Sequence, residues 1–233
     1  VASDEDTIDG PTLNGATAAG LFDVNSCGTL YSKGVHERLA PASLTKVMTA
    51  LVALKYGHLD DTITASSSVN NMESGAQVVG IKEGDRLTLD QAMHAMLIYS
   101  GNDAAIVIAE YISGSVDDFC TLMNEEALKL GATNTNFVNP HGLSAEGHYT
   151  TAYDLYLIFN EAVKFDKFKE IIAMTDYQTT YSDRDGNSKE LNITNSNLYL
   201  SGDRSMPAGV TVLGGKTGTT NQAGSCLILL SSD

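Results

Sequence analysis

One long apolar segment dominates the hydrophobic pattern of the chain. In SLTKVMTALVALKYG, residues 43–57, apolar side chains occupy nearly every face of a helical projection. A helix that is apolar all round is a buried helix. Pro41 lies near the first turn of this segment and Gly57 near its end, where these residue types are favoured. The pattern therefore predicts a buried helix early in the chain.

The remaining pattern predicts an α+β fold. Four further segments have helical spacing of apolar residues: Leu89–Tyr99, Asn102–Ile112, Val116–Leu130 and Thr151–Val163. Strand-like segments lie near both ends: Ala16–Val24, Thr29–Tyr31, Val210–Leu213 and Cys226–Leu230. The polar region 178–198 is ambiguous and suits a hairpin around Asp185-Gly186-Asn187. The order of strands, helices and strands predicts an antiparallel sheet with strands from both chain ends, flanked by helices.

Composition narrows the function classes. The 233 residues carry a net charge of −15, so phosphate backbones would repel the chain and nucleic-acid binding is not expected. No apolar run reaches the roughly 18 residues of a membrane span, although an anchor outside this chain is left open. We divide the chain into an acidic tail, residues 1–11, and one domain, residues 12–233. The five histidines and three cysteines show no metal or disulfide spacing, so free thiols, no metal and no cofactor are expected.

The first candidate chemistry is Ser43-Leu44-Thr45-Lys46, an S-x-x-K motif at the start of the apolar helix. Residues three apart share one helix face, so the lysine amine can reach the serine hydroxyl. A serine becomes a good nucleophile when a neighbour takes its proton, and burial lets a lysine do so by lowering its pKa. Alone the motif is weak, because roughly one is expected by chance in a chain of this length.

Two further motifs lie far along the chain. Ser100-Gly101-Asn102 joins two predicted helices, where a polar turn can present a hydroxyl and an amide to a cleft. Lys216-Thr217-Gly218 suits a strand edge that offers a positive charge, a hydroxyl and a close backbone approach. A P-loop is excluded, since that motif needs glycine at position 210, which is Val210.

The three motifs, in this order, resemble those of penicillin-binding proteins and serine β-lactamases. The surrounding segments PASLTKVMTAL, EGDRLTLDQAMHAMLIYSGNDAA, NPHGLSAEGHYTTAYDL and GGKTGTTNQAGSCL resemble the low-molecular-mass D-alanyl-D-alanine carboxypeptidases. The resemblance runs from about residue 16 to the end. It implies a catalytic domain that removes the terminal D-Ala of peptidoglycan stem peptides outside the cytoplasm, at the cell wall and in association with the membrane, and that β-lactams inhibit.

The resemblance also implies roles for the matching residues. Ser43 would be the acylated nucleophile and Lys46 its general base. Ser100 and Asn102 would pass protons and hold the substrate.

Lys216 and Thr217 would bind the substrate's terminal carboxylate, beside Gly218. The backbone N–H groups of Ser43 and Thr219 would form the oxyanion hole.

Two departures from the family pattern stand out. Relatives often carry a basic residue between the two asparagines upstream of K-T-G, where this chain has Asn195-Ser196-Asn197. Relatives also continue past the K-T-G hairpin, so we expect the native chain to continue beyond Asp233 with a strand and a helix.

Two other functions stay open. One is a serine β-lactamase, but the one segment that resembles its deacylation motif, residues 188–192, has Ser188 where the catalytic glutamate would stand, and Glu190 fits an ordinary strand or turn position. The other is a non-hydrolytic β-lactam sensor or wall-binding module. His141 and His148 lie in the NPHGL loop, where a structural role is expected.

Overall fold

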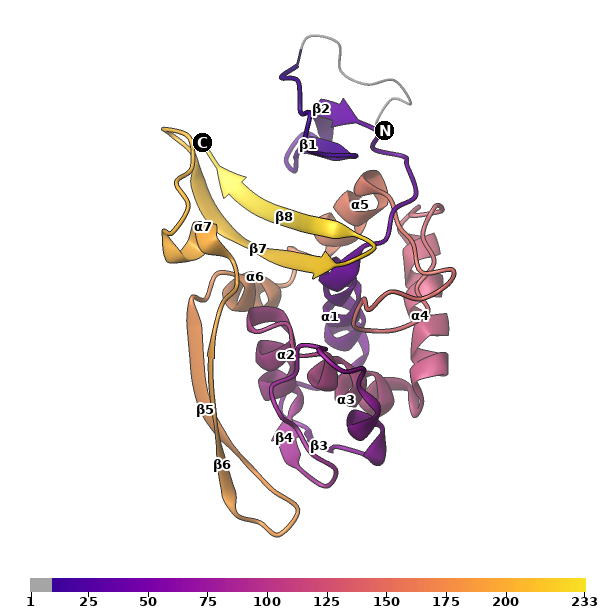
Figure 1. The fold of residues 1–233 in the computed structure, drawn as a ribbon, viewed down its shortest axis with the longest axis vertical. Coiled ribbons are helices and arrows are strands. Elements are labelled where there is room, and N and C mark those ends of the chain that lie inside the picture. The colour runs from indigo at the N-terminus through magenta and orange to yellow at the C-terminus, as the bar shows by residue number, and fades with distance from the viewer. Residues whose placement is uncertain (1–9) are drawn as a thin grey trace.

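The computed structural model describes residues 10–233, and a buried helix lies at its centre (Figure 1). This helix, α1 (Thr45–Tyr56), is buried from Thr45 to Ala53 and follows a single 3₁₀ turn, η1 (Ala42–Leu44). Four helices pack around it: α2 (Leu89–Ile98), α3 (Asn102–Ser113), α4 (Val116–Lys129) and α5 (Ala152–Ala162). These are the helices that the sequence predicts, with ends that differ by two residues at most.

The strands form three antiparallel units. Two are hairpins, β1 (Ala19–Asp23) with β2 (Gly28–Lys33), and β7 (Thr211–Thr220) with β8 (Gly224–Ser232). The third is a four-stranded sheet in the order β3 (Thr62–Thr64), β4 (Arg86–Thr88), β5 (Asp176–Ser182) and β6 (Ser188–Thr194). Shorter helices complete the described chain: η2 (Ser67–Asn71), α6 (Asp166–Ile172) and α7 (Leu198–Ser201).

The predicted α+β class is confirmed, and the details differ in two ways. The hairpin predicted around residues 185–187 is present as β5–β6, but within residues 10–233 the strands from the two chain ends form separate hairpins and not one hydrogen-bonded sheet. The strand predicted at Val210–Leu213 continues through the K-T-G motif to Thr220, because this segment pairs along its length with β8. The acidic tail lies mostly outside the described residues.

The site is positioned by the β7–β8 hairpin, which crosses the start of α1 (Figure 1). β7 packs on η1 on one side of the crossing and contacts α6 further along. A Cβ atom added to Gly214 of β7 would lie 2.7 Å from the Ile172 side chain of α6, so glycine allows this close approach. The K-T-G motif is thereby placed over Ser43. No helix in the described part of the chain is long and apolar enough to span a membrane.

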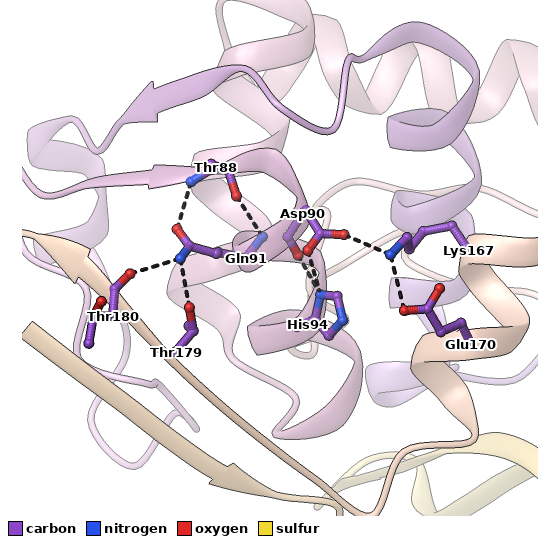
Figure 2. A network of polar contacts seen from close by, with 8 residues as sticks. All are labelled: Thr88, Asp90, Gln91, His94, Lys167, Glu170, Thr179 and Thr180. Atoms are coloured by element: carbon purple, nitrogen blue, oxygen red, sulfur yellow. Dashed lines mark hydrogen bonds and ion pairs between the residues drawn. The ribbon is translucent and has the colours of Figure 1, made fainter.

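A polar network ties α2 to the β5–β6 hairpin and to α6 (Figure 2). Thr88 and Gln91 form a capping box at the start of α2, and the Gln91 amide also donates to Thr179 Oγ1 at 2.9 Å and to the Thr180 carbonyl at 2.8 Å. On the opposite side of α2, Lys167 of α6 contacts Asp90 at 3.3 Å. These contacts fix the orientation of α2, whose C-terminal end leads into the Ser100–Asn102 turn.

We predict that Gln91→Ala lowers the free energy of unfolding by about 1–2 kcal/mol, because it removes half of the capping box and both bonds to β5. Urea unfolding measures this loss. Gln178→Ala is the matched control, since Gln178 is exposed on β5, and it is expected to change stability by less than about 0.5 kcal/mol. Equal stability of the two variants would show that the network contributes nothing.

Candidate active site

Ser43 lies in the 3₁₀ turn η1, directly before the buried helix α1. Its neighbour Ala42 has a left-handed backbone, with φ at 48°. Gly142 packs against this turn so closely that a Cβ atom there would lie 1.9 Å from the Ala42 carbonyl oxygen. The loop that contains Gly142 thus packs directly against the turn and tolerates no side chain at residue 142.

Lys46 is fully buried one turn further along and is surrounded by oxygen atoms. Its Nζ lies 2.9 Å from Ser43 Oγ, 2.7 Å from Asn102 Oδ1 and 2.7 Å from the His141 carbonyl oxygen. Burial lowers the pKa of Lys46 well below its usual range, nearby Lys216 lowers it further, and Asp103 partly opposes the shift. A neutral amine beside a serine hydroxyl can accept its proton.

Lys216 approaches the same site from β7 and is also buried. Its Nζ donates to Ser100 Oγ at 3.0 Å and to the Thr217 carbonyl at 2.9 Å. Burial lowers its pKa to about 7. Ser100 has a left-handed backbone with φ at 70°, which turns its hydroxyl toward this second lysine. The two lysines therefore contact different hydroxyls across one site.

β7 passes so close to η1 that its central residue must be glycine. A Cβ atom at Gly218 would lie 2.8 Å from the Ser43 backbone nitrogen. Any side chain here would cover the N–H that the family resemblance assigns to the oxyanion hole. The hole itself, formed by the N–H groups of Ser43 and Thr219, stays a prediction, and the glycine is consistent with it.

The sequence analysis gave no site role to two residues that lie at the site. Ser196 Oγ lies 2.6 Å from Thr217 Oγ1, and Ser196 lines the cleft. Asp103, buried directly after the S-x-N motif, accepts hydrogen bonds from the backbone N–H groups of Val79, Gly80 and Ile81 at 2.9–3.1 Å. Its position next to Asn102 was the only available sign.

The loop that Asp103 holds at residues 79–81 contributes Gly75, Ala76 and Gln77 to the lining of a cleft of about 430 Å³. Six of the eight predicted site residues line it: Ser43, Ser100, Asn102, Thr217, Gly218 and Thr219. Lys46 and Lys216 lie behind this surface and contact Ser43 and Ser100. The structure thus brings all three motifs together. Within residues 10–233 the cysteines are free, and no cluster of three or more His, Cys, Asp or Glu could hold a metal ion.

His141 and His148, the two histidines of the loop that begins with NPHGL, form hydrogen bonds close to the site. His148 Nδ1 accepts from the Val138 N–H at 3.0 Å, and its Nε2 lies 2.9 Å from Thr45 Oγ1. His141 Nδ1 accepts from the Leu143 N–H at 3.2 Å, while its carbonyl oxygen accepts from Lys46. Burial lowers the pKa of His148 to about 4 and that of His141 to about 3, so both rings are neutral at pH 7. These contacts support a structural role for both rings.

A serine hydroxyl beside a buried lysine whose pKa is lowered is the arrangement of an enzyme that transfers acyl groups through a serine. Comparison with known proteins specifies the family. The family model described as D-alanyl-D-alanine carboxypeptidase, peptidase family S11, matches residues 6–233. The chain belongs to this family.

Individual relatives agree with this assignment. The chain is 36% identical over 217 residues to the D-alanyl-D-alanine carboxypeptidase DacF of Bacillus subtilis and 36% identical over 234 residues to DacC of Escherichia coli. These alignments cover 91% and 96% of this chain but 53% and 55% of the relatives, so the chain spans about half of their length. The crystal structure of the Streptomyces K15 DD-transpeptidase superposes with a TM-score of 0.87 at 26% identity, over 97% of this chain and 88% of that one.

From the burial of His148 we predict that the free energy of unfolding decreases in acid. Between about pH 6.5 and pH 4 the unfolded chain binds a proton at residue 148 that the folded chain does not, so the free energy of unfolding falls as the pH falls. The slope from this group reaches about 1.4 kcal/mol per pH unit. His148→Gln removes it, and unfolding curves in this pH range measure the change. The exposed His58→Gln serves as control, and an equal slope in both variants would contradict the buried-histidine account.

Proposed function

We propose that this chain is the catalytic domain of a serine DD-carboxypeptidase. It removes the terminal D-Ala from peptidoglycan stem peptides through an acyl-enzyme on Ser43, acts outside the cytoplasm, and is acylated by β-lactams. The observation that carries the proposal is the 2.9 Å contact between Ser43 Oγ and the buried Lys46 amine, whose pKa is lowered. Membership of the carboxypeptidase family supports the choice of substrate.

The chemistry follows from the positions of these groups. Ser43 Oγ attacks the carbonyl carbon between the two D-Ala residues, and its proton passes to the neutral Lys46 Nζ. The tetrahedral intermediate places its negative oxygen at the Ser43 and Thr219 N–H groups. When the C–N bond breaks, the departing amine takes from Lys46 the proton that came from Ser43 and leaves as D-Ala. A water molecule then attacks the Ser43 ester, releases the shortened peptide and restores the hydroxyl.

The part of the cleft that is lined by Thr217 and Ser196 suits the substrate's terminal carboxylate. These two residues place their hydroxyl groups 2.6 Å apart, and the charge of Lys216 lies behind them. A hydroxyl can donate to a carboxylate, and a buried cation strengthens that attraction.

The alternative of a class A β-lactamase has less support. Those enzymes deacylate with a glutamate acting through a water molecule. No Asp or Glu is among the described residues that line the cleft, and Glu190 is exposed on β6, paired with Thr180. A non-hydrolytic binding module has less support, because the 2.9 Å contact between Ser43 Oγ and Lys46 Nζ suits catalysis.

The proposal predicts a long-lived penicillin adduct and release of D-Ala. After incubation with a fluorescent penicillin and removal of excess drug, intact-protein mass spectrometry is expected to show one adduct that persists, while a diacyl D-Ala-D-Ala peptide yields free D-Ala. Ser43→Ala, which removes one hydroxyl, is expected to abolish both. Rapid loss of the adduct with many penicillin turnovers would favour a β-lactamase. An adduct without any release of D-Ala would favour a sensor.

From the lowered pKa values of Lys46 and Lys216 we predict a bell-shaped pH dependence of kcat/KM for D-Ala release. The ascending limb reports loss of the Lys46 proton, because only the neutral amine can act as a base. The descending limb lies near pH 7 in the free enzyme, where Lys216 loses the charge that attracts the carboxylate. Lys216→Ala is expected to lower kcat/KM and to remove the descending limb. A descending limb unchanged in that variant would exclude Lys216 as its source.

A further inference from the structure

The cleft differs in charge from the rest of the protein. The chain has 29 acidic and 14 basic residues, yet no Asp or Glu is among the described residues that line the cleft. Arg204 is the one basic residue in that lining, and it is exposed. A cleft with one sign of charge concentrates ligands of the opposite sign. In this acidic protein, the cleft is therefore suited to an anion.

A backbone hydrogen bond fixes Arg204 at the cleft, while its side chain forms no ion pair or hydrogen bond among the described residues. α7 ends at Gly202, which has a left-handed backbone with φ at 82°, and the Arg204 N–H then donates to the Leu198 carbonyl at 3.0 Å. The neighbouring carboxylate of Asp203 accepts from Ser201 Oγ at 2.7 Å. The Arg204 guanidinium forms no ion pair or hydrogen bond with any residue in the range 10–233. It is free to bind a ligand.

A second observation on the same wall points to a ligand rich in acceptors. Asn197, which caps α7, is fully buried and lies against the cleft. Its Oδ1 accepts from the Tyr199 N–H at 3.1 Å, but its Nδ2 has no hydrogen-bond partner among the described residues. The Asn197 amide and the Arg204 guanidinium are thus hydrogen-bond donors on this wall that have no acceptor among the described residues. The Thr217 and Ser196 hydroxyls are bonded to each other, which leaves one further O–H that can donate to a ligand.

We propose that Arg204 is a specificity-determining residue that binds a carboxylate of the peptide substrate. This inference rests on the proposed function and adds a residue outside the three motifs. The planar guanidinium can donate two parallel hydrogen bonds to a carboxylate, which Lys216 cannot, because its buried amine already contacts Ser100 and the Thr217 carbonyl. The carboxylate belongs either to the terminal D-Ala or to an acidic side chain on the acyl side of the scissile bond.

The experiment compares the parent with Arg204→Ala, Arg204→Lys and Arg184→Ala. Arg184 is an exposed arginine in the turn between β5 and β6, so its substitution is the matched control. Three diacyl peptides distinguish the sources. The first has only the terminal carboxylate, the second has a terminal carboxamide and an acidic side chain before D-Ala-D-Ala, and the third has neither. The rate of release of D-Ala or D-alaninamide gives kcat and KM.

Arg204→Ala is expected to lower kcat/KM roughly tenfold or more on one of the first two peptides, mainly through KM, and to leave the third unchanged. Arg204→Lys is expected to recover part of the loss, and Arg184→Ala to match the parent. The affected peptide identifies the carboxylate. The inference is overturned if Arg204→Ala matches the parent on the first two peptides, or loses as much on the third.

Failure of the proposed function gives a different result. In that case the parent releases no D-Ala from the first peptide. The same four proteins then react with a penicillin and with its methyl ester, and intact-protein mass spectrometry follows acylation of Ser43. Arg204→Ala is expected to slow acylation by the free acid only. Equal slowing with both compounds rejects the carboxylate site, and slowing with neither rejects the terminal carboxylate as the ligand of Arg204.

Discussion

The burial of Lys46 is the constraint on which the site depends. An amine with no exposed surface keeps its place only if its hydrogen-bonding capacity is met, and here three oxygen atoms meet it. They come from the turn before α1, the first residue of α3 and the loop at His141. Burial of one side chain thereby fixes three segments relative to one another, and the same burial lowers the lysine's pKa so that it can act as a base.

The second buried lysine, Lys216, is linked to Lys46 both by its charge and through the Ser100–Asn102 turn. Lys216 enters from β7 and adds a positive charge that lowers the pKa of Lys46 further. Lys216 is itself held by Ser100, so the S-x-N turn contacts one lysine through its serine and the other through Asn102. A shift of this turn would disturb both lysines at once. The two buried lysines are therefore coupled through a single turn.

Backbone strain is concentrated at the same place. Ala42 and Ser100 both have positive φ values, which cost a non-glycine residue free energy and persist only where the surroundings hold them. Ala42 is held by the close approach of Gly142. Ser100 is held by Lys216, and Gln77 forms hydrogen bonds with Tyr99 before it and Asn102 after it. The packed helices that surround α1 supply the rigidity that keeps the nucleophile and its neighbours in place.

The sequence alone was sufficient for the features that depend on local spacing. The apolar run after Ser43 identified the buried helix, and the three-residue separation of Ser43 and Lys46 placed their side chains on one face. The order of the three motifs identified the family. The glycine-rich segment around Lys216 was assigned too short a strand, because glycine disfavours strands and only packing against η1 and pairing with β8 explain its extension.

Contacts between distant segments were decided by tertiary structure. The 3.0 Å bond from Lys216 to Ser100 joins residues 116 positions apart, and the contact between Ser196 and Thr217 depends on how α7 returns the chain to β7. The position of Arg204 at the cleft depends on the same return. No periodicity encodes these distances, because they follow from the path of the chain through space. The sequence thus determined which groups the chain carries, and the folded backbone decided which of them meet.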